Sequence, residues 1–188
     1  HIVRGDTLRR PAFHFGDTLA SFDCVIANPP FSLEKWGEEV WSSDPYGRNF
    51  AGVPPSKSGD FAWVQHMIMS MSDITGRMAV VLPHGVLFRM SREGVIRRKL
   101  LEMDMLEAVI GLGQNIFYGT SLAPCILVFR KHKPEAHRQH ILFLDASGEF
   151  KSGRAQNELL PEHVDRIHSL YEAWQDEVGL CRIVSLDE

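Results

Sequence analysis

Short apolar runs alternate with polar, turn-rich stretches along the 188 residues of this chain. Apolar runs that end at Pro, Gly or charged residues are typical of buried strands, and apolar positions three and four residues apart predict helices packed on a sheet. The tail of a strand opens the chain; further strands are expected at 22–27, 77–83, 106–112, 122–130 and 141–144, and helices at 60–72, 92–103 and 159–174. Strands alternating with helices predict an α/β protein.

The run that begins at Phe22 leads through apolar residues to Asn28 and then to Pro29 and Pro30. Proline cannot donate a hydrogen bond to a neighbouring strand, so a buried parallel strand ends there in a rigid turn. Asn28 is therefore expected at the carboxyl edge of the sheet, where open α/β sheets bind ligands.

The Asn-Pro-Pro-Phe sequence suits chemistry on an amino group attached to an aromatic ring. Such a nitrogen is a poor nucleophile because its lone pair is delocalised into the ring. The side-chain oxygen of Asn28 and the carbonyl of Pro29 can both accept its hydrogen bonds, while Phe31 stacks on the ring. The alternative is that Asn-Pro only starts a turn and that Phe31 is a core residue.

Asn-Pro-Pro-Phe after a strand resembles the catalytic motif of amino-group methyltransferases that use S-adenosylmethionine. The order of the later segments is similar to that of the modification subunit of type I restriction-modification systems, which methylates N6 of adenine in DNA. The resemblance covers about residues 5–172. It implies a Rossmann-like methyltransferase fold, present in part: a catalytic domain in 1–150 with the C-terminal part of the sheet, and a C-terminal helical extension in 151–188.

The resemblance also assigns roles to individual residues. The catalytic residues would be Asn28, Pro29, Pro30 and Phe31; the cofactor would contact Asp6, Thr7, Leu8 and Asn28; the target base would contact Phe31, Phe117 and Tyr118. Two alternatives stay open. Asp6 could simply cap a turn, and Phe117 could be an apolar residue that closes the end of the sheet. The Gly-Asp-Thr-Leu sequence recurs at residues 16–19, where we expect a turn or a helix cap.

Residues 32–59 form a long polar stretch with aromatic content, and we expect a loop over the base or along DNA that is mobile without DNA. Arg48 and Lys57 are candidate phosphate contacts. Asp60 begins the next helix, where it could contact the cofactor, order the loop or act as a plain cap.

One part of the family pattern is missing from these residues. No Gly-x-Gly-x-x-Gly turn follows a strand, although such a turn would cradle the methionine part of the cofactor. The chain also begins at His1 without an initiator Met, which indicates a fragment. We therefore expect these residues alone neither to bind the cofactor well nor to catalyse transfer.

The charge and the cysteine content of the chain indicate which partners and which compartment to expect. A net charge of -4 does not favour a protein that neutralises many phosphates alone, so other chains or missing segments would supply much of the grip on DNA. By resemblance these chains are a specificity subunit, a restriction subunit and a second modification subunit. The three cysteines are widely spaced and predict reduced thiols in the cytoplasm, with no metal site. No apolar run is long enough to span a membrane.

Three other functions remain compatible with the sequence. The same motif serves amino methyltransferases that act on RNA or on a protein glutamine. A self-contained restriction enzyme could hold methylase, nuclease and specificity parts in one chain. A degenerate methyltransferase fold could act as a non-catalytic scaffold, although the intact Asn28 motif argues against that.

Overall fold

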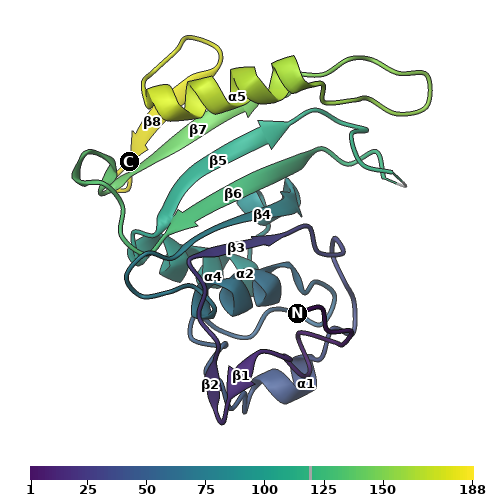
Figure 1. The fold of residues 1–188 in the computed structure, drawn as a ribbon, viewed down its shortest axis with the longest axis vertical. Helices are drawn as coiled ribbons and strands as arrows, with labels where there is room; N and C mark the ends of the chain where they lie inside the picture. The colour runs from purple at the N-terminus through teal and green to yellow at the C-terminus, as the bar shows by residue number, and fades with distance from the viewer. Residues whose placement is uncertain (119) are drawn as a thin grey trace.

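A mixed six-stranded sheet runs through the centre of the protein (Figure 1). The computed structural model describes residues 1–118 and 120–188. In spatial order the strands are β3 (Cys24–Ala27), β4 (Arg77–Pro83), β6 (Pro124–Arg130), β5 (Leu106–Leu112), β7 (His140–Ala146) and β8 (Cys181–Ser185). The protein therefore has the mixed α/β fold that the alternating strand and helix patterns predict.

Strand direction determines which loops meet at one edge of the sheet. β3 pairs parallel to β4, and β5 pairs parallel to β7, whereas β6 runs antiparallel to both β4 and β5. β3, β4, β5 and β7 thus all end at the same edge, which we call the carboxyl edge. β5 and β6 form an antiparallel pair, and β8 adds an antiparallel strand next to β7.

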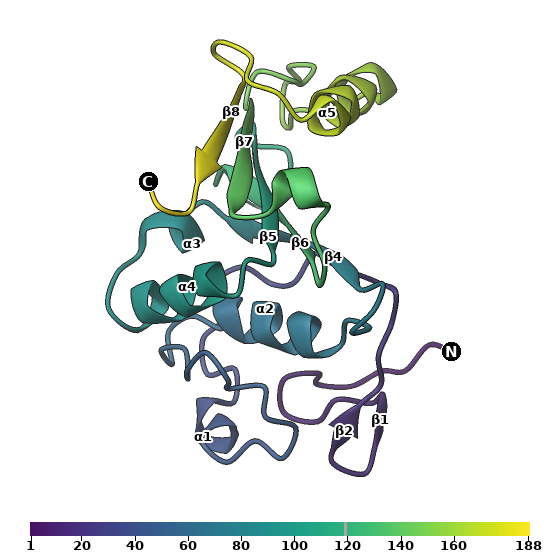
Figure 2. The same ribbon diagram turned by 90° about the vertical axis from the view of Figure 1, so that its left-hand side faces the viewer.

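Helices cover the two faces of the sheet unequally (Figure 2). One face carries α2 (Asp60–Met69), α3 (Gly85–Phe88) and α4 (Arg92–Glu102), and the other carries α5 (Pro161–Ala173). The alternation of side chains along each strand sends residues to both faces and builds two apolar cores. The core under α2 and α4 includes Met78, Val80, Leu82, Leu127 and Phe129. The core under α5 includes Ala108, Ile110, Leu112, Leu142 and Leu144.

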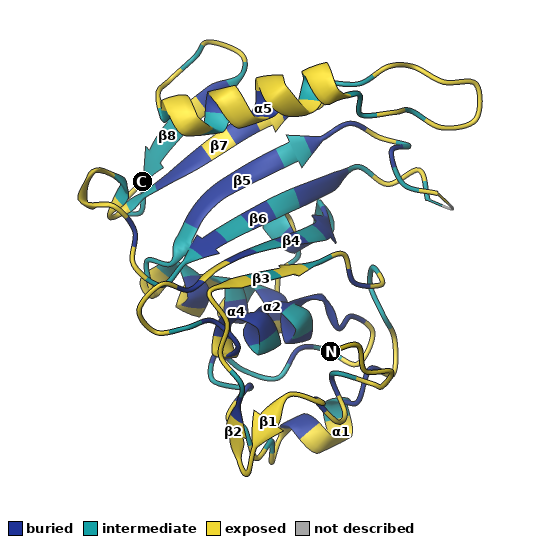
Figure 3. Ribbon diagram, viewed as in Figure 1, coloured by how far each residue is buried: buried dark blue, intermediate teal, exposed yellow. Residues whose placement is uncertain are grey.

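The strand that leads to Asn28 lies at the border of the sheet. Val25 and Ala27 pack against the core beneath α2, but Ile26 on the opposite face is 77% exposed (Figure 3). Our expectation of a fully buried strand is therefore wrong, although its parallel pairing with β4 is as expected. α5 covers only the far part of the sheet, so the outer face of β3 has no helix of the described chain over it.

Residues 32–59 contain α1 (Glu38–Trp41) and a small core of their own. Trp36 and Trp41 are buried and contact each other edge to face. The Arg48 side chain is also buried; its Nη2 lies 2.6 Å from Asp44 Oδ1, and its guanidinium lies over the Trp41 ring. Arg48 is thus a structural residue and not the phosphate contact we expected, because its donors are used inside the protein. The segment is packed and differs from the mobile loop that its polarity predicts.

The beginning of the chain differs from its prediction. In the described chain, residues 1–13 form turns and no strand, and the first strands are the short hairpin β1 (His14–Phe15) and β2 (Thr18–Leu19). Gly16 adopts a positive φ of 58° in the tight turn between them, which glycine tolerates without strain. The predicted turn at residues 16–19 is therefore confirmed.

The boundaries of the long elements agree closely with the sequence patterns. The ranges of α2, α4 and α5 lie within the predicted helices, and β5 matches its prediction at both ends. β8 and the 3-10 helix η1 (Glu135–His137) are not predicted. No helix in the described ranges is long and apolar enough to cross a membrane.

Candidate active site

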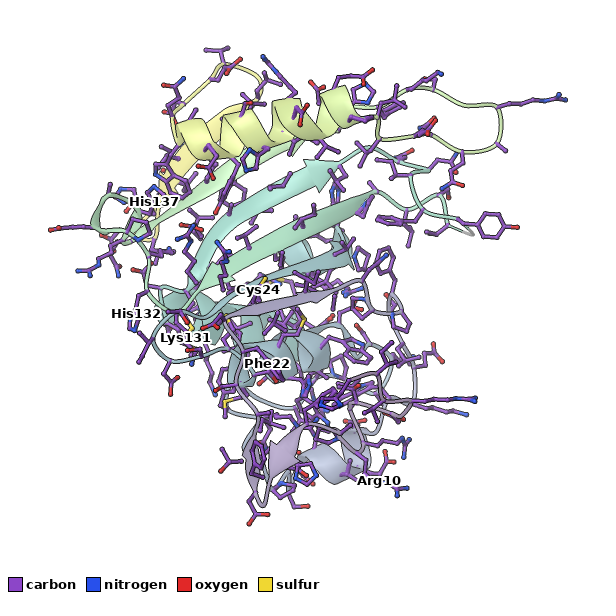
Figure 4. All side chains as sticks on the ribbon, viewed as in Figure 1. Arg10, Phe22, Cys24, Lys131, His132 and His137 are labelled. Carbon is purple, nitrogen blue, oxygen red and sulfur yellow. The ribbon has the colours of Figure 1, made fainter. Side chains whose placement is uncertain are left out.

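Asn28 directly follows β3 and lies at the carboxyl edge of the sheet, as its two prolines predict. Asn28 and Pro30 are exposed, whereas Pro29 is buried and anchors the turn. Figure 4 labels Phe22, which precedes β3, and Cys24, the first residue of β3, at the opposite end of that strand from Asn28. The amide of Asn28 is therefore held on a rigid turn and accessible to a ligand.

Two aromatic rings meet beside this turn. Phe31 and Phe117 lie with ring centroids 6.2 Å apart and planes at 83°, an edge-to-face contact. Phe117 comes from the segment after β5, so the fold brings together the two aromatic residues that the sequence places near the base. Tyr118, the next residue, is 94% exposed. Position 119 of the same predicted turn lies outside the described residues.

The residue after Phe31 has an unusual backbone. Ser32 has φ of 49°, in the left-handed region that costs free energy for a residue with a side chain. Its backbone N–H donates to Oδ1 of Asp60 at 2.7 Å. Asp60 makes no capping bond to its own helix, so it orders the segment after β3 and does not act as the plain cap that the sequence also allowed.

Asp60 belongs to a buried polar cluster that the sequence does not reveal. Its other carboxylate oxygen accepts from Arg89 and from Ser58 Oγ, which lies 3.2 Å away. Arg89 Nε also lies 2.9 Å from Glu93, and Ser58 Oγ donates to Glu93 at 3.1 Å. The i, i+4 spacing of Arg89 and Glu93 is a signal for their pairing, but nothing local connects them to Asp60.

Cys125 lies near this cluster, at the beginning of β6. Its side chain is fully buried. Burial, and then the negative charge of Asp60, raise the pKa of the Cys125 thiol to about 12. The thiol therefore stays protonated and is not a nucleophile at neutral pH.

Three of the four residues assigned to the cofactor lie near the beginning of the chain and have different environments. Asp6 is exposed, and its Oδ1 accepts from the backbone N–H of Arg9 at 3.0 Å, which closes a local turn. The carbonyls of Thr7 and Leu8 accept from the Arg48 guanidinium at 3.0 and 2.9 Å. The Asp6 carboxylate is therefore accessible to a ligand, whereas the carbonyls of Thr7 and Leu8 are already bonded within the protein.

A cavity of about 240 Å³ adjoins Thr7, between the turns of residues 3–13, the beginning of β3 and the end of α2. Phe13, Phe22 and Val25 give it apolar walls, and His66 lies at its end. Burial, followed by the positive charge of Arg48, lowers the pKa of His66 to about 4, while Asp44 opposes the shift. The imidazole is thus neutral at physiological pH. The described side chains offer no group of three metal-ligating residues.

A mixed α/β sheet with an Asn-Pro-Pro-Phe turn at its carboxyl edge is the arrangement of an amino-group methyltransferase domain. The chain belongs to the N-6 DNA methylase family, whose model matches residues 1–188.

Relatives with curated names agree with this assignment. The chain is 36% identical over 196 residues to the type I restriction enzyme MjaVII methylase subunit of Methanocaldococcus jannaschii; the match covers 100% of this chain and 33% of that protein. It is 30% identical over 169 residues to the MpnII methylase subunit of Mycoplasma pneumoniae, covering 89% of this chain and 31% of the relative. The chain thus spans about a third of the length of these relatives.

Solved structures give the same picture of the fold. The methyltransferase subunit of a type I restriction-modification system from Streptococcus thermophilus superposes with a TM-score of 0.82 at 35% identity, over 90% of this chain and 35% of that one. The M protein of the type I restriction enzyme EcoKI superposes with a TM-score of 0.64 at 22% identity, over 89% of this chain and 33% of the other. At that lower identity the likeness concerns the fold alone.

Proposed function

We propose that the full-length protein transfers a methyl group from S-adenosylmethionine to N6 of adenine in DNA, as the modification subunit of a type I restriction-modification system. The position of Asn28, Pro29, Pro30 and Phe31 at the carboxyl edge, next to Phe117, carries the proposal. Membership of the N-6 DNA methylase family and the names of the relatives support it. A Rossmann-like sheet completed by segments outside this chain would be the scaffold.

The roles of Asn28 and Pro29 follow from the electronic structure of adenine. Oδ1 of Asn28 and the carbonyl of Pro29 accept the two N–H bonds of the N6 amino group, which favours a nitrogen whose lone pair is available. S-adenosylmethionine supplies, when bound, a methyl group on a positively charged sulfur. As the nitrogen takes up that methyl group it becomes positive, and the two oxygens stabilise the charge. One N6 proton then leaves to solvent.

The base must leave the double helix to reach this turn, because N6 lies inside the base stack. A flipped adenine would stack on Phe31, and Phe117 would cover its second face. The two rings now touch edge to face at 6.2 Å, so they must separate to admit a base between them. Tyr118 is exposed on the same segment and could contact the flanking nucleotides.

The residues present fit one end of the cofactor. The exposed Asp6 carboxylate can accept a hydrogen bond from the amino group of its adenine, and the apolar cavity beside Thr7 is of a size to take an aromatic ring. Leu8 is buried, and its carbonyl is already bonded to Arg48 and Trp41, so it would act through packing. We propose that residues 1–188 alone are inactive, since these contacts hold only one end.

DNA binding would be shared with other chains. The net charge of -4 gives this segment no general attraction for phosphates. A specificity subunit would select the sequence, a restriction subunit would complete the assembly, and a second modification subunit could serve the other strand. Lys57 is exposed and remains a predicted phosphate contact. We place the assembly in the cytoplasm, where free cysteines such as Cys24 stay reduced.

The test uses the full-length protein with its specificity subunit, labelled S-adenosylmethionine and DNA. Asn28→Ala should reduce transfer to adenine N6 by roughly 100-fold or more, because one of the two acceptors is lost. Gln175→Ala removes another exposed amide, just after α5, and should leave transfer unchanged.

Other outcomes favour other functions. Transfer to RNA or to a protein glutamine, with DNA unmodified, would assign a different substrate to the same turn. A well-folded assembly that binds the cofactor but transfers no methyl group to any of these substrates would support the scaffold function.

A further inference from the structure

We propose that Asp60 and Arg89 are positioning residues that hold the Asn28–Phe31 turn in its reactive shape. This inference rests on the proposed methyl transfer and concerns how the same site is kept in place. The two residues come from the beginning of α2 and from the end of α3, and neither belongs to the catalytic sequence motif.

The strained backbone at Ser32 is the first argument. A serine with φ of 49° relaxes to a more favourable conformation unless its surroundings hold it. The 2.7 Å bond from its N–H to Asp60 Oδ1 supplies such a hold. Because Ser32 directly follows Phe31, its relaxation would change the direction of the chain at the aromatic ring and, through the two prolines, at the Pro29 carbonyl.

Burial makes this hold strong. The Asp60 carboxylate is fully buried, so it has no water to satisfy its charge and depends on its protein partners. Arg89 supplies the opposite charge, and its Nη1 also lies 3.4 Å from Ser32 Oγ. The same arginine therefore contacts both the carboxylate and the residue that the carboxylate holds.

The arrangement also joins two loops of the carboxyl edge. Ser32 follows β3, whereas Arg89 follows β4 and α3. The Glu93 carboxylate lies 2.9 Å from Arg89 Nε and adds a second negative charge beside the guanidinium. The segment after the Asn28 turn is thus joined by polar contacts to the beginning of α2 and to the end of α3, at the border of the sheet.

Substitutions should separate the two contacts of Asp60. Asp60→Asn keeps an oxygen for the Ser32 N–H but removes the charge that holds Arg89, so methyl transfer should slow by roughly tenfold. Asp60→Ala removes both and should slow it by roughly 100-fold, the size of effect expected when reacting groups are misplaced by about 1 Å. Arg89→Gln should resemble Asp60→Asn, and the double variant should lose no more than either single variant.

Asp104 provides a matched control. Its carboxylate also accepts from a buried cation, Lys133 at 2.7 Å, and from a backbone N–H, that of Gln139 at 3.0 Å. It lies just before β5, at the edge of the sheet opposite Asn28. Asp104→Asn therefore removes the same kind of charge without touching the turn.

The experiment measures single-turnover methyl transfer, S-adenosylmethionine affinity and thermal midpoint for the full-length protein with its specificity subunit. Asp60→Asn should lower the transfer rate while cofactor affinity and midpoint stay close to those of Asp104→Asn. Equal transfer rates for these two variants, beside an active wild type, would overturn the inference. A loss of rate matched by a fall in the thermal midpoint below that of Asp104→Asn would also overturn it, because it would indicate general destabilisation.

Two further results keep the outcomes distinct. A wild-type assembly that transfers no methyl group to DNA contradicts the proposed function itself. If Asp60→Ala does not fold, Asp60→Asn and Arg89→Gln decide: coupled losses support the positioning role, and independent losses contradict it.

Discussion

Asp60 and Glu107 are both fully buried carboxylates that pair with an arginine, yet they lie at opposite edges of the sheet. Glu107 lies near the beginning of β5. Its carboxylate accepts hydrogen bonds from Arg130 Nε at 2.8 Å and from the Tyr171 hydroxyl at 2.6 Å, and it lies 2.9 Å from His137 Nδ1. Every one of these partners is a side chain. Asp60 instead holds the backbone of a turn next to the candidate catalytic residues.

We infer that the bonding partner of each carboxylate, and not the burial of its charge, distinguishes the proposed positioning role of Asp60 from the structural role of Glu107. Glu107 joins β5 to β6, to η1 and to α5, and Trp174 at the end of α5 stacks on His137 with centroids 3.6 Å apart. Figure 4 places His137 at the edge where β6 ends. Loss of the Glu107 cluster should therefore cost stability, whereas loss of the Asp60 contacts should cost transfer rate.

The largest effect is expected from Glu107→Ala. It leaves Arg130 and the Tyr171 hydroxyl without their acceptor, so the free energy of unfolding should fall by about 3–5 kcal/mol. Chemical denaturation of the full-length protein measures this change. The folded fraction should keep its methyl transfer rate; a loss of rate in that fraction would remove the contrast with Asp60.

A second prediction uses pH on the Asp60 side. His66 has a pKa of about 4 when folded and an ordinary value of about 6.5 when unfolded. The unfolded chain therefore binds the extra proton first, and the stability present above pH 6.5 is lost as the pH falls toward 4. Between pH 7 and 5 the wild type should lose about 2 kcal/mol more than His66→Gln. Parallel stability profiles for the two proteins would show that His66 is solvated.

The smallest effect compares one hydroxyl from each cluster. Tyr171→Phe removes the donor to Glu107, and Ser58→Ala removes the donor shared by Asp60 and Glu93; each should cost about 1–2 kcal/mol of unfolding free energy. Only the serine variant should also slow methyl transfer. Burial and the charge of Glu107 raise the pKa of Tyr171 to about 12, so its contribution should not change between pH 6 and 9. Equal transfer rates for both variants would contradict the different roles that we assign to the Asp60 and Glu107 clusters.

Local patterns predict the long elements because burial of one face imposes a period on the sequence. β5 and α4 follow from such periods, and the position of Asn28 follows from Pro29 and Pro30, which end a strand wherever it lies. β8 escapes prediction because Cys181 is buried but the residues after it are exposed or only partly buried, so no alternation is legible.

The features that the sequence does not predict depend mainly on polar contacts between residues far apart in the chain. Arg48 could not be separated from a surface arginine, because its burial depends on Trp41 and on the carbonyls of Thr7 and Leu8, some 40 residues earlier. The contact from Asp60 to Ser32 spans 28 residues, and that to Arg89 spans 29. No local period encodes such separations, so the residues that support the site appear only in the fold.

The three cysteines lie at different depths, so the rate at which each thiol reacts reports how often its part of the molecule opens. Cys24 is exposed and should react with a thiol reagent at once. Cys125 is buried beside Asp60 and stays protonated, so it can be modified only when the carboxyl edge opens. Cys181 is buried next to α5 and reports on the other half in the same way. Labelling the native protein with a thiol reagent over time, followed by mass spectrometry, would thus rank the opening frequencies of the two halves without any engineered residue.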